Sequence, residues 1–336
     1  MTDVDTVGRD RLAVAVLAQY RMATTEQMHL ILSPDVRIEQ TRRRLVKLRS
    51  EGLIDRITLP QAGRMRVWYA TRYGAQVASE WPELRGRRPP RGAHDRTAVR
   101  LGVGHGLTVT ETALAFLQDA RRRGDLCQPL DWIPEVHHSL GGGEAVIPDA
   151  LLYYRSSGTS GADKSGDGED GGAMLRAFVE VDRATMGPER LAAKIHAYAR
   201  LHQYVPTPPP GARHRTAGQE PTREEWRRRY PLFPRLLIVL DGTGPAGIHT
   251  RLQALHAAAQ QPELAVFLRE VPVLTASMTD LLRHGPTAPV WHPVTDPDQR
   301  IGWMHTRQAS PGPTTSAEPG ATGPTTAGHS PAWGAS

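Results

Sequence analysis

Two acid-bearing segments near the middle of the chain constrain its fold and chemistry more than any other feature. Residues 147–154 read Ile-Pro-Asp-Ala-Leu-Leu-Tyr-Tyr, and residues 177–182 read Ala-Phe-Val-Glu-Val-Asp. Both segments are short and apolar and have Gly-rich neighbours, which is typical of β-strands. Because side chains alternate between the two faces of a strand, Glu180 and Asp182 share a face, and pairing of the two strands would bring Asp149 near them.

The three carboxylates predict a divalent-cation site. Converging like charges repel one another, whereas a hard cation such as Mg²⁺ takes carboxylate oxygens as ligands. We therefore expect Asp149 and Glu180 to bind Mg²⁺, with Mn²⁺ as a substitute, and Asp182 to belong to the same catalytic site. In the alternative interpretation the acids only end strands that face solvent, and the residue types alone favour neither.

Positive charge is concentrated in the first third of the chain. Residues 1–100 hold 19 Lys and Arg against 11 Asp and Glu, whereas the remainder holds 22 against 24. This asymmetry predicts a nucleic-acid-binding part followed by a part of another kind. The chain has no run of eighteen apolar residues, no signal-peptide pattern and one cysteine, Cys127. These features predict a cytoplasmic protein without a membrane span or an internal disulfide.

The basic first third is expected to contain three short helices and a β-hairpin. Thr24 and Gln27 fit a capping box at the start of the second helix. The third helix is expected over residues 36–51, and Gly52 ends it. Its predicted core face consists of Ile38, Thr41, Leu45 and Leu48.

This order of elements resembles a winged helix-turn-helix, in which the third helix lies in the DNA major groove and the hairpin contacts phosphates. The resemblance implies double-stranded DNA as the partner. The alternatives are a solvated charged face and a winged helix used for protein docking. The expected DNA contacts are Arg37, Gln40, Arg43, Arg44 and Lys47 on the helix, and Arg64 and Arg66 on the hairpin.

Composition divides the chain into four predicted regions. These are a winged helix at residues 8–84, a basic Pro/Gly-rich linker at 85–94, an α/β domain at 95–304 and a disordered tail at 305–336. Within the α/β domain, flexible insertions are expected near 156–173 and 206–221. Its expected elements include a helix over 108–122 and strands over 132–140 and 264–271.

The expected α-β-β-β-α-β order, with Pro148-Asp149 and Glu180-x-Asp182, resembles the PD-(D/E)XK restriction-endonuclease-like fold. Joined to a winged helix, it resembles the replication-relaxation family of bacterial proteins over roughly residues 10–292. That resemblance also draws on Arg183-Ala184-Thr185, Lys194-x-x-x-Tyr198 and a late Gly285-Pro286. It implies a role in the replication, relaxation or transfer of plasmid or mobile-element DNA, with replication or transfer proteins and a homodimer as the partners to consider.

The chain departs from the nuclease pattern at one position. The lysine expected two residues after Glu180 is replaced by Asp182, and Lys194 on the following helix is the candidate substitute. Two functions therefore stay open: a metal-dependent nuclease or nickase, and a non-catalytic DNA-binding regulator. A third, distant alternative is a nucleotide-dependent enzyme using residues 242–247, which match G-x-G-x-x-G, although Pro245 and the late position favour an ordinary strand-to-helix turn.

Overall fold

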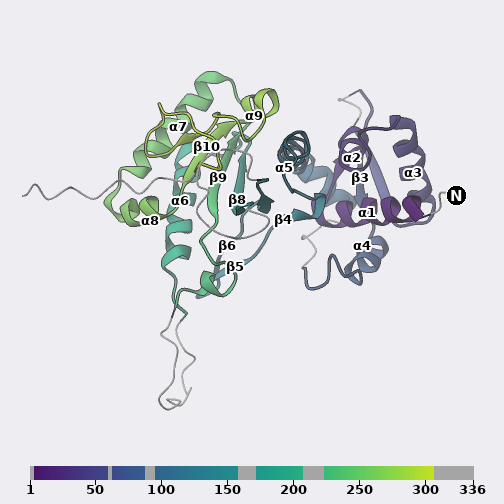
Figure 1. Cartoon of the computed structure of the whole chain (residues 1–336), viewed down its shortest axis with the longest axis horizontal. Helices are drawn as coiled ribbons and strands as arrows, with labels where there is room; N and C mark the ends of the chain where they lie inside the picture. Colours follow the sequence, from purple (N-terminus) through teal and green to yellow (C-terminus); the bar gives the residue numbers. More distant parts are fainter. Residues whose placement is uncertain (1–3, 60–62, 88–94, 158–171, 207–222, 306–336) are drawn as a thin grey trace, which may run out of the picture. The chain divides into compact units, whose positions relative to one another are not determined.

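Alternating helical and strand periodicities produce a mixed α/β fold, as predicted. The computed structural model describes residues 4–59, 63–87, 95–157, 172–206 and 223–305 (Figure 1). Residues 1–304 belong to one compact unit. The predicted tail and most of the predicted linker and insertions lie outside the described residues.

The N-terminal part contains four helices and a three-stranded sheet of order β1-β3-β2. Thr24 and Gln27 form the predicted capping box, with Gln27 N donating to Thr24 Oγ1 at 3.1 Å and Thr24 N donating to Gln27 Oε1 at 3.0 Å. The elements are α1 (Val4–Tyr20), β1 (Ala23–Thr24), α2 (Thr25–Leu32), α3 (Ile38–Ser50), β2 (Ile54–Leu59), β3 (Met65–Ala70) and α4 (Arg72–Ser79).

Helix α3 has the predicted amphipathic character. Thr41, Leu45 and Leu48 are buried, and Gly52 follows the helix with a φ of +74°, a conformation that glycine adopts without steric cost. Strands β2 and β3 pair in antiparallel orientation as the predicted hairpin. Trp68 of β3 donates its indole N–H to Thr25 Oγ1 of α2 at 2.9 Å.

Helix α5 (Arg96–Arg123) is longer than the predicted helix over 108–122. Asp95 accepts a hydrogen bond from Thr97 N at 2.8 Å and begins the helix. The added turns contain Gly102, Gly104 and Gly106, which lower helix propensity by about 1 kcal/mol each relative to alanine. Two of these glycines accommodate close neighbours, since a Cβ at Gly106 would meet the Met22 side chain at 2.9 Å and one at Gly104 would meet Arg183. Packing therefore overrides local propensity here.

The second sheet has the order β11-β10-β9-β8-β7-β4 (Figure 1). Its central strand β8 pairs with β7 in antiparallel and with β9 in parallel orientation. A separate two-stranded sheet contains β5 (His138–Gly141) and β6 (Glu144–Val146). The strands of the larger sheet are β4 (Trp132–Pro134), β7 (Ala150–Arg155), β8 (Met174–Asp182), β9 (Arg235–Leu240), β10 (Val273–Ser277) and β11 (His292–Pro293).

Alternate residues of β8 enter two different cores. Phe178 packs with residues of α6 and α7, whereas Val179 and Val181 pack with residues of α5 on the opposite face. This two-sided burial explains why residues 177–179, on both faces of the strand, are all apolar. The remaining helices are α6 (Pro188–Gln203), α7 (Pro245–Ala259), α8 (Ala265–Glu270) and α9 (Met278–His284), with short 3₁₀ turns η2 (Pro129–Asp131), η3 (Glu225–Arg228) and η4 (Pro262–Leu264).

One predicted strand is interrupted, and a second is wrong. The segment 132–140 is interrupted after β4, because Glu135 adopts a φ of +52° and the chain turns into the separate β5–β6 sheet. The segment 264–271 forms η4 and α8, and the strand follows at β10. Over so short a stretch, the apolar residues fit the period of a helix and that of a strand equally well. The buried Phe267 and Leu268 lie on helix α8.

A buried carboxylate joins the end of α5 to the sheet. Asp125 accepts hydrogen bonds from Tyr154 Oη at 2.7 Å, Ser157 N at 2.7 Å and Arg123 Nε at 2.9 Å. Burial alone would raise the pKa of Asp125, but these hydrogen bonds outweigh it and lower the pKa to about 2. The charged carboxylate therefore stabilises the fold.

We predict that Asp125→Asn lowers the free energy of unfolding at pH 7 by about 2 kcal/mol, because one pKa unit corresponds to about 1.4 kcal/mol. The folded-state pKa lies below the unfolded value, so the stabilisation is present above about pH 4 and is lost as the pH falls toward 2. Urea denaturation at pH 7 and pH 3 measures both effects. The exposed Asp298→Asn is the control, and equal stability of the two variants at pH 7 would contradict the prediction.

Candidate nucleic-acid interface and carboxylate cluster

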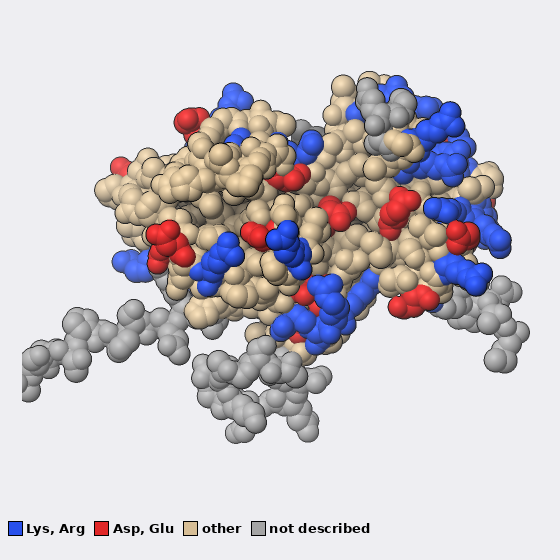
Figure 2. Space-filling view, turned by 90° about the horizontal axis from the view of Figure 1, so that it is seen from above, with Lys and Arg blue, Asp and Glu red and all other residues tan. Residues whose placement is uncertain are grey.

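The outer face of α3 is strongly basic. Figure 2 shows Lys and Arg gathered over the part of the surface formed by α1 to α4. All of the predicted DNA contacts except Arg44 are exposed. The exposed cations of this part are Arg37, Arg42, Arg43, Lys47, Arg49, Arg64, Arg66 and Arg72. The face can thus offer several cations to one polyanion.

Arg44 and Lys47 are not equivalent to Arg43. Both pair with Asp10 of α1, through Arg44 Nε to Oδ1 at 2.6 Å and Lys47 Nζ to Oδ2 at 3.0 Å. The Arg44 side chain is only 10% exposed, whereas that of Lys47 is 61% exposed. Arg44 therefore fixes α3 against α1, and Arg43 and Lys47 remain accessible from solvent.

The β2–β3 hairpin carries the other two predicted contacts. Arg64 and Arg66 are both exposed beside the turn, and Arg64 has a φ of +62°. Residues 60–62 at the tip lie outside the described residues. Arg56 of the same hairpin lies over the Trp68 ring at 5.5 Å, so it packs on the sheet.

The predicted acids are brought together only in part. Asp149 precedes β7, and its Oδ2 accepts a hydrogen bond from Val181 N of β8 at 2.7 Å. Its Oδ1 lies 2.9 Å from Nε2 of His105 on α5. Burial raises the pKa of Asp149, but the hydrogen bond and charge of His105 outweigh burial and leave that pKa below its ordinary value. The same contact holds the pKa of His105 above its ordinary value.

Glu180 is buried on β8 and is held by two residues of α6. Lys194 Nζ donates to Glu180 Oε2, and Tyr198 Oη donates to Oε1 at 2.7 Å. Burial, followed by the charge of Asp149, raises the pKa of Glu180. Burial lowers the pKa of Lys194, but the charges of Glu180 and Asp149 outweigh burial and raise it. These mutual effects place Asp149, Glu180 and Lys194 in one electrostatic cluster.

Asp182 is directed to a different partner. Its Oδ2 accepts a hydrogen bond from Arg251 Nε of α7 at 2.6 Å, and its Oδ1 accepts one from Ala184 N at 3.1 Å. Both members of the Asp182–Arg251 pair are buried. Asp182 therefore anchors the end of β8 to α7, and Lys194 is the cation that reaches Glu180.

A bound Mg²⁺ would have to compete for oxygens that already have partners. No three His, Cys, Asp or Glu side chains gather to hold a metal ion in the described part of the chain. Asp149 and Glu180 are two carboxylates in electrostatic contact, and Mg²⁺ is commonly held by one or two carboxylates together with water and substrate phosphates. The residues present therefore fit a Mg²⁺ ion only if His105 and Lys194 release their oxygens.

His105 was missed in the sequence interpretation. It lies in a Gly-rich stretch, 44 positions before Asp149, and no local pattern signals the contact. The G-x-G-x-x-G segment joins β9 to α7, as expected for a strand-to-helix turn. A Cβ at Gly247 would meet Thr243 Oγ1 at 2.0 Å, so close packing accounts for this glycine.

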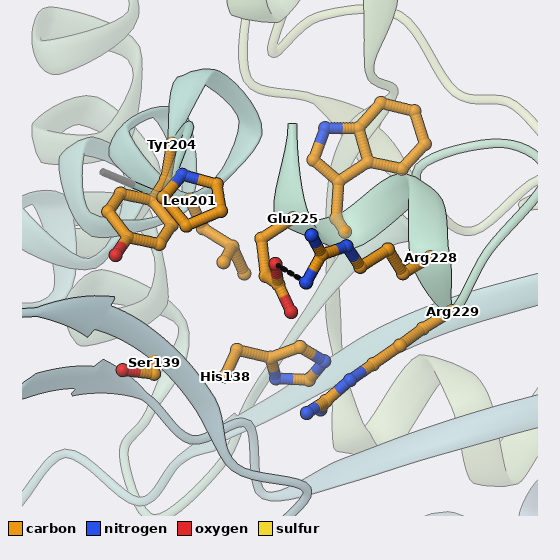
Figure 3. Close-up of a pocket in the computed structure, with 9 residues that line it drawn as sticks. His138, Ser139, Leu201, Tyr204, Glu225, Arg228 and Arg229 are labelled. Carbon is orange, nitrogen blue, oxygen red and sulfur yellow. Dashed lines mark ion pairs between the residues drawn. The ribbon is translucent and has the colours of Figure 1, made fainter. Parts of the chain in front are cut away.

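A pocket of about 300 Å³ lies among β5, the end of α6 and η3 (Figure 3). His138 and Tyr204 face it, and Glu225 pairs with Arg228 at 3.0 Å. Burial, with the charge of Arg229, lowers the pKa of His138 to about 4, and its Nε2 lies 2.8 Å from Tyr230 Oη. None of the predicted site residues lines this pocket.

We predict that Lys194→Met destabilises the protein more at pH 8 than at pH 5. Without the lysine, Glu180 must be ionised in a buried site or stay protonated, so its raised folded-state pKa removes stability as the pH rises. The expected loss is about 3 kcal/mol at pH 8. Urea denaturation at both pH values measures it. Adding Glu180→Gln should make the loss of stability the same at both pH values. A loss in Lys194→Met that is already independent of pH would contradict the account.

Comparison with known proteins identifies the chain's family. No helix in the described ranges has the length and apolarity needed to cross a membrane. No curated protein and no solved structure matches the chain. A family model described as replication-relaxation matches residues 14–214, more than half of the chain, and spans both the α1–α4 part and the carboxylate cluster. The resemblance inferred from the sequence is thereby confirmed, and the chain belongs to the replication-relaxation family.

Proposed function

We propose that this protein binds double-stranded DNA and acts on plasmid or mobile-element DNA during replication, relaxation or transfer. The observation that carries the proposal is the row of exposed cations on α3, continued by Arg64 and Arg66 on the hairpin. Three helices followed by a hairpin have the element order of a winged helix-turn-helix, in which a basic helix and a wing contact one duplex. Family membership supports the same role. The role we propose is carried out in the cytoplasm, with replication or transfer proteins as partners.

The contacts on α3 refine which residues bind DNA. Arg43 and Lys47 are exposed and lie four positions apart, so both point to the same side of the helix. Arg44 contributes mainly by holding α1 and α3 together through Asp10. A variant that removes Arg44 would therefore mix a loss of binding with a loss of stability.

Arg43→Ala combined with Lys47→Ala should weaken duplex binding and reduce the slope of log Kd against log salt by about 1.8. Each lost phosphate contact removes about 0.9 from that slope. Fluorescence anisotropy with a labelled duplex at several salt concentrations measures both quantities. Arg269→Ala combined with Arg283→Ala is the matched control, since these exposed residues of α8 and α9 carry the same charge. If both double variants lose affinity equally, binding depends only on net charge, and the proposed interface is wrong.

A second candidate function is Mg²⁺-dependent cleavage of a DNA strand by a restriction-endonuclease-like centre. The observation that favours it is the contact of Lys194 with Glu180, which puts a cation beside the acid although Asp182 occupies the usual lysine position. Asp149 and Glu180 would hold the ion, which would supply Lewis-acid stabilisation of phosphoryl charge. Lys194, after releasing the Glu180 oxygen, would keep a positive charge near the ion, and Val181 N would orient the Asp149 carboxylate.

Asp149→Asn should abolish both a Mg²⁺-dependent rise in the melting temperature and any nicking of supercoiled plasmid. A ligand that binds only the native state raises the melting temperature, and the substitution removes one of its two carboxylates. Duplex binding through α3 should persist, and Asp298→Asn should behave like the parent protein. A thermal shift in the parent without nicking would support a metal-binding site without cleavage. Absence of both in the parent would favour the non-catalytic regulator.

A further inference from the structure

Arg183 is a cation without a hydrogen-bonding partner among the described residues. It follows β8 directly, and its side chain is 33% exposed. The nearest carboxylate oxygen is Asp241 Oδ2, which lies 4.0 Å from Arg183 Nε, and this buried nitrogen makes no hydrogen bond within the described ranges. A guanidinium carries five N–H donors. Arg183 therefore has donor capacity that the fold itself does not use.

Two glycines shape the space that Arg183 occupies. A Cβ at Gly104 of α5 would lie 2.2 Å from Arg183 Nη1, and a Cβ at Gly242 would lie 2.4 Å from the Arg183 carbonyl oxygen. Gly242 also has a φ of +74°, which disfavours other residues. Each glycine comes from one of the two glycine-rich stretches, before and after Arg183 in the chain. Gly104 thus lowers the helix propensity of α5 but allows the Arg183 guanidinium to pack against this helix.

The ammonium group of Lys194 and the imidazole of His105 lie near Arg183. The Lys194 side chain is 32% exposed and the His105 side chain 45% exposed, whereas that of Glu180 is 3% exposed. Arg183 Nη1 packs against Gly104, the residue before His105, and the charges of Lys194 and Arg183 both lower the pKa of His105, so the three residues lie within electrostatic reach of one another. The acids Asp149 and Glu180 use their oxygens on Val181 N, His105, Tyr198 and Lys194, and the Asp149 side chain is 20% exposed. The accessible side of the cluster therefore presents the cations Arg183 and Lys194 next to the partly exposed acids Asp149 and Asp241.

We propose that Arg183, together with Lys194 and His105, binds a phosphate group of a DNA strand beside Asp149. Because Arg183 Nε is buried, the phosphate would be bound by Nη1 and Nη2, whose planar arrangement matches a phosphodiester in a bidentate geometry, and Lys194 adds a point charge. The inference rests on the proposed action on DNA and adds to it a strand-binding site separate from the α3 interface. Its specific residue is Arg183, which belongs to none of the predicted DNA contacts.

The test uses one substitution that moves the guanidinium without removing any charge. Gly104→Ala places a methyl group where Arg183 Nη1 now lies, while Gly102→Ala on the same helix meets nothing within 4 Å. Both substitutions raise helix propensity by the same amount, so the pair isolates the position of Arg183. The probe is a fluorescein-labelled oligothymidylate of about eight nucleotides, and the protein is the full chain carrying Arg43→Ala and Lys47→Ala, so that α3 contributes little.

Gly104→Ala should weaken binding of this probe about fivefold, and Arg183→Gln about tenfold with a salt slope smaller by about 0.7, the value for one phosphate contact of a single strand. The affinity of Arg183→Lys for the probe should lie between the affinities of these two variants and that of the parent. The affinity of Gly102→Ala should equal that of the parent. Parental affinity in both Gly104→Ala and Arg183→Gln would overturn the proposal. If Arg183→Gln does not fold, the probe affinities of Gly104→Ala and Arg183→Lys test the proposal, and parental affinity in both would overturn it.

Plasmid nicking by the same variants separates this proposal from the proposed function. If the probe binds through Arg183 although the parent never nicks DNA, the phosphate site stands and the cleavage candidate fails. If the parent nicks DNA and Arg183→Gln binds and nicks equally well, the cleavage candidate stands and the phosphate site is wrong.

Discussion

The charge of Glu180, buried on the central strand β8, is the constraint on which the candidate site depends. A carboxylate in this position needs a nearby cation and hydrogen-bond donors, and α6 supplies both through Lys194 and Tyr198. The same requirement explains the direction of Asp182, which turns to Arg251 of α7. One strand therefore carries two buried acids, and each one attaches a different helix to the sheet.

Helix α5 connects this cluster to the basic hairpin. Val99 and Val103 pack with Ile57, Val67 and Tyr69 of β2 and β3, and two residues further on His105 contacts Asp149. The glycines of the same stretch allow Met22 and Arg183 to approach the helix closely. A single helix thus contacts both the hairpin and Asp149, so it links the two regions that we propose to contact DNA.

The sequence predicted the elements whose patterns are local. The capping box of Thr24 and Gln27, the buried face of α3 and strand β8 with its two acids follow from local spacing, whereas Asp149 was predicted inside a strand and lies just before β7. It could not predict the contact of His105 with Asp149 or the pairing of Arg44 with Asp10, because those partners are far apart in the chain. The extension of α5 was missed because glycine signals a turn locally, while here it serves tertiary contacts. The strand over 264–271 was wrong because a short apolar stretch fits either period.

The central claim is that DNA contacts both the α3–hairpin surface and the cluster around Arg183. Amide hydrogen exchange of the full chain, with and without a duplex that carries a single-stranded end, tests it most directly. The account predicts slower exchange upon DNA binding in α3, in β2 and β3, and in residues 102–108 and 181–185, with no change in α8. Slower exchange confined to β5 and η3 around the pocket of Figure 3, or no change in α3, would contradict it.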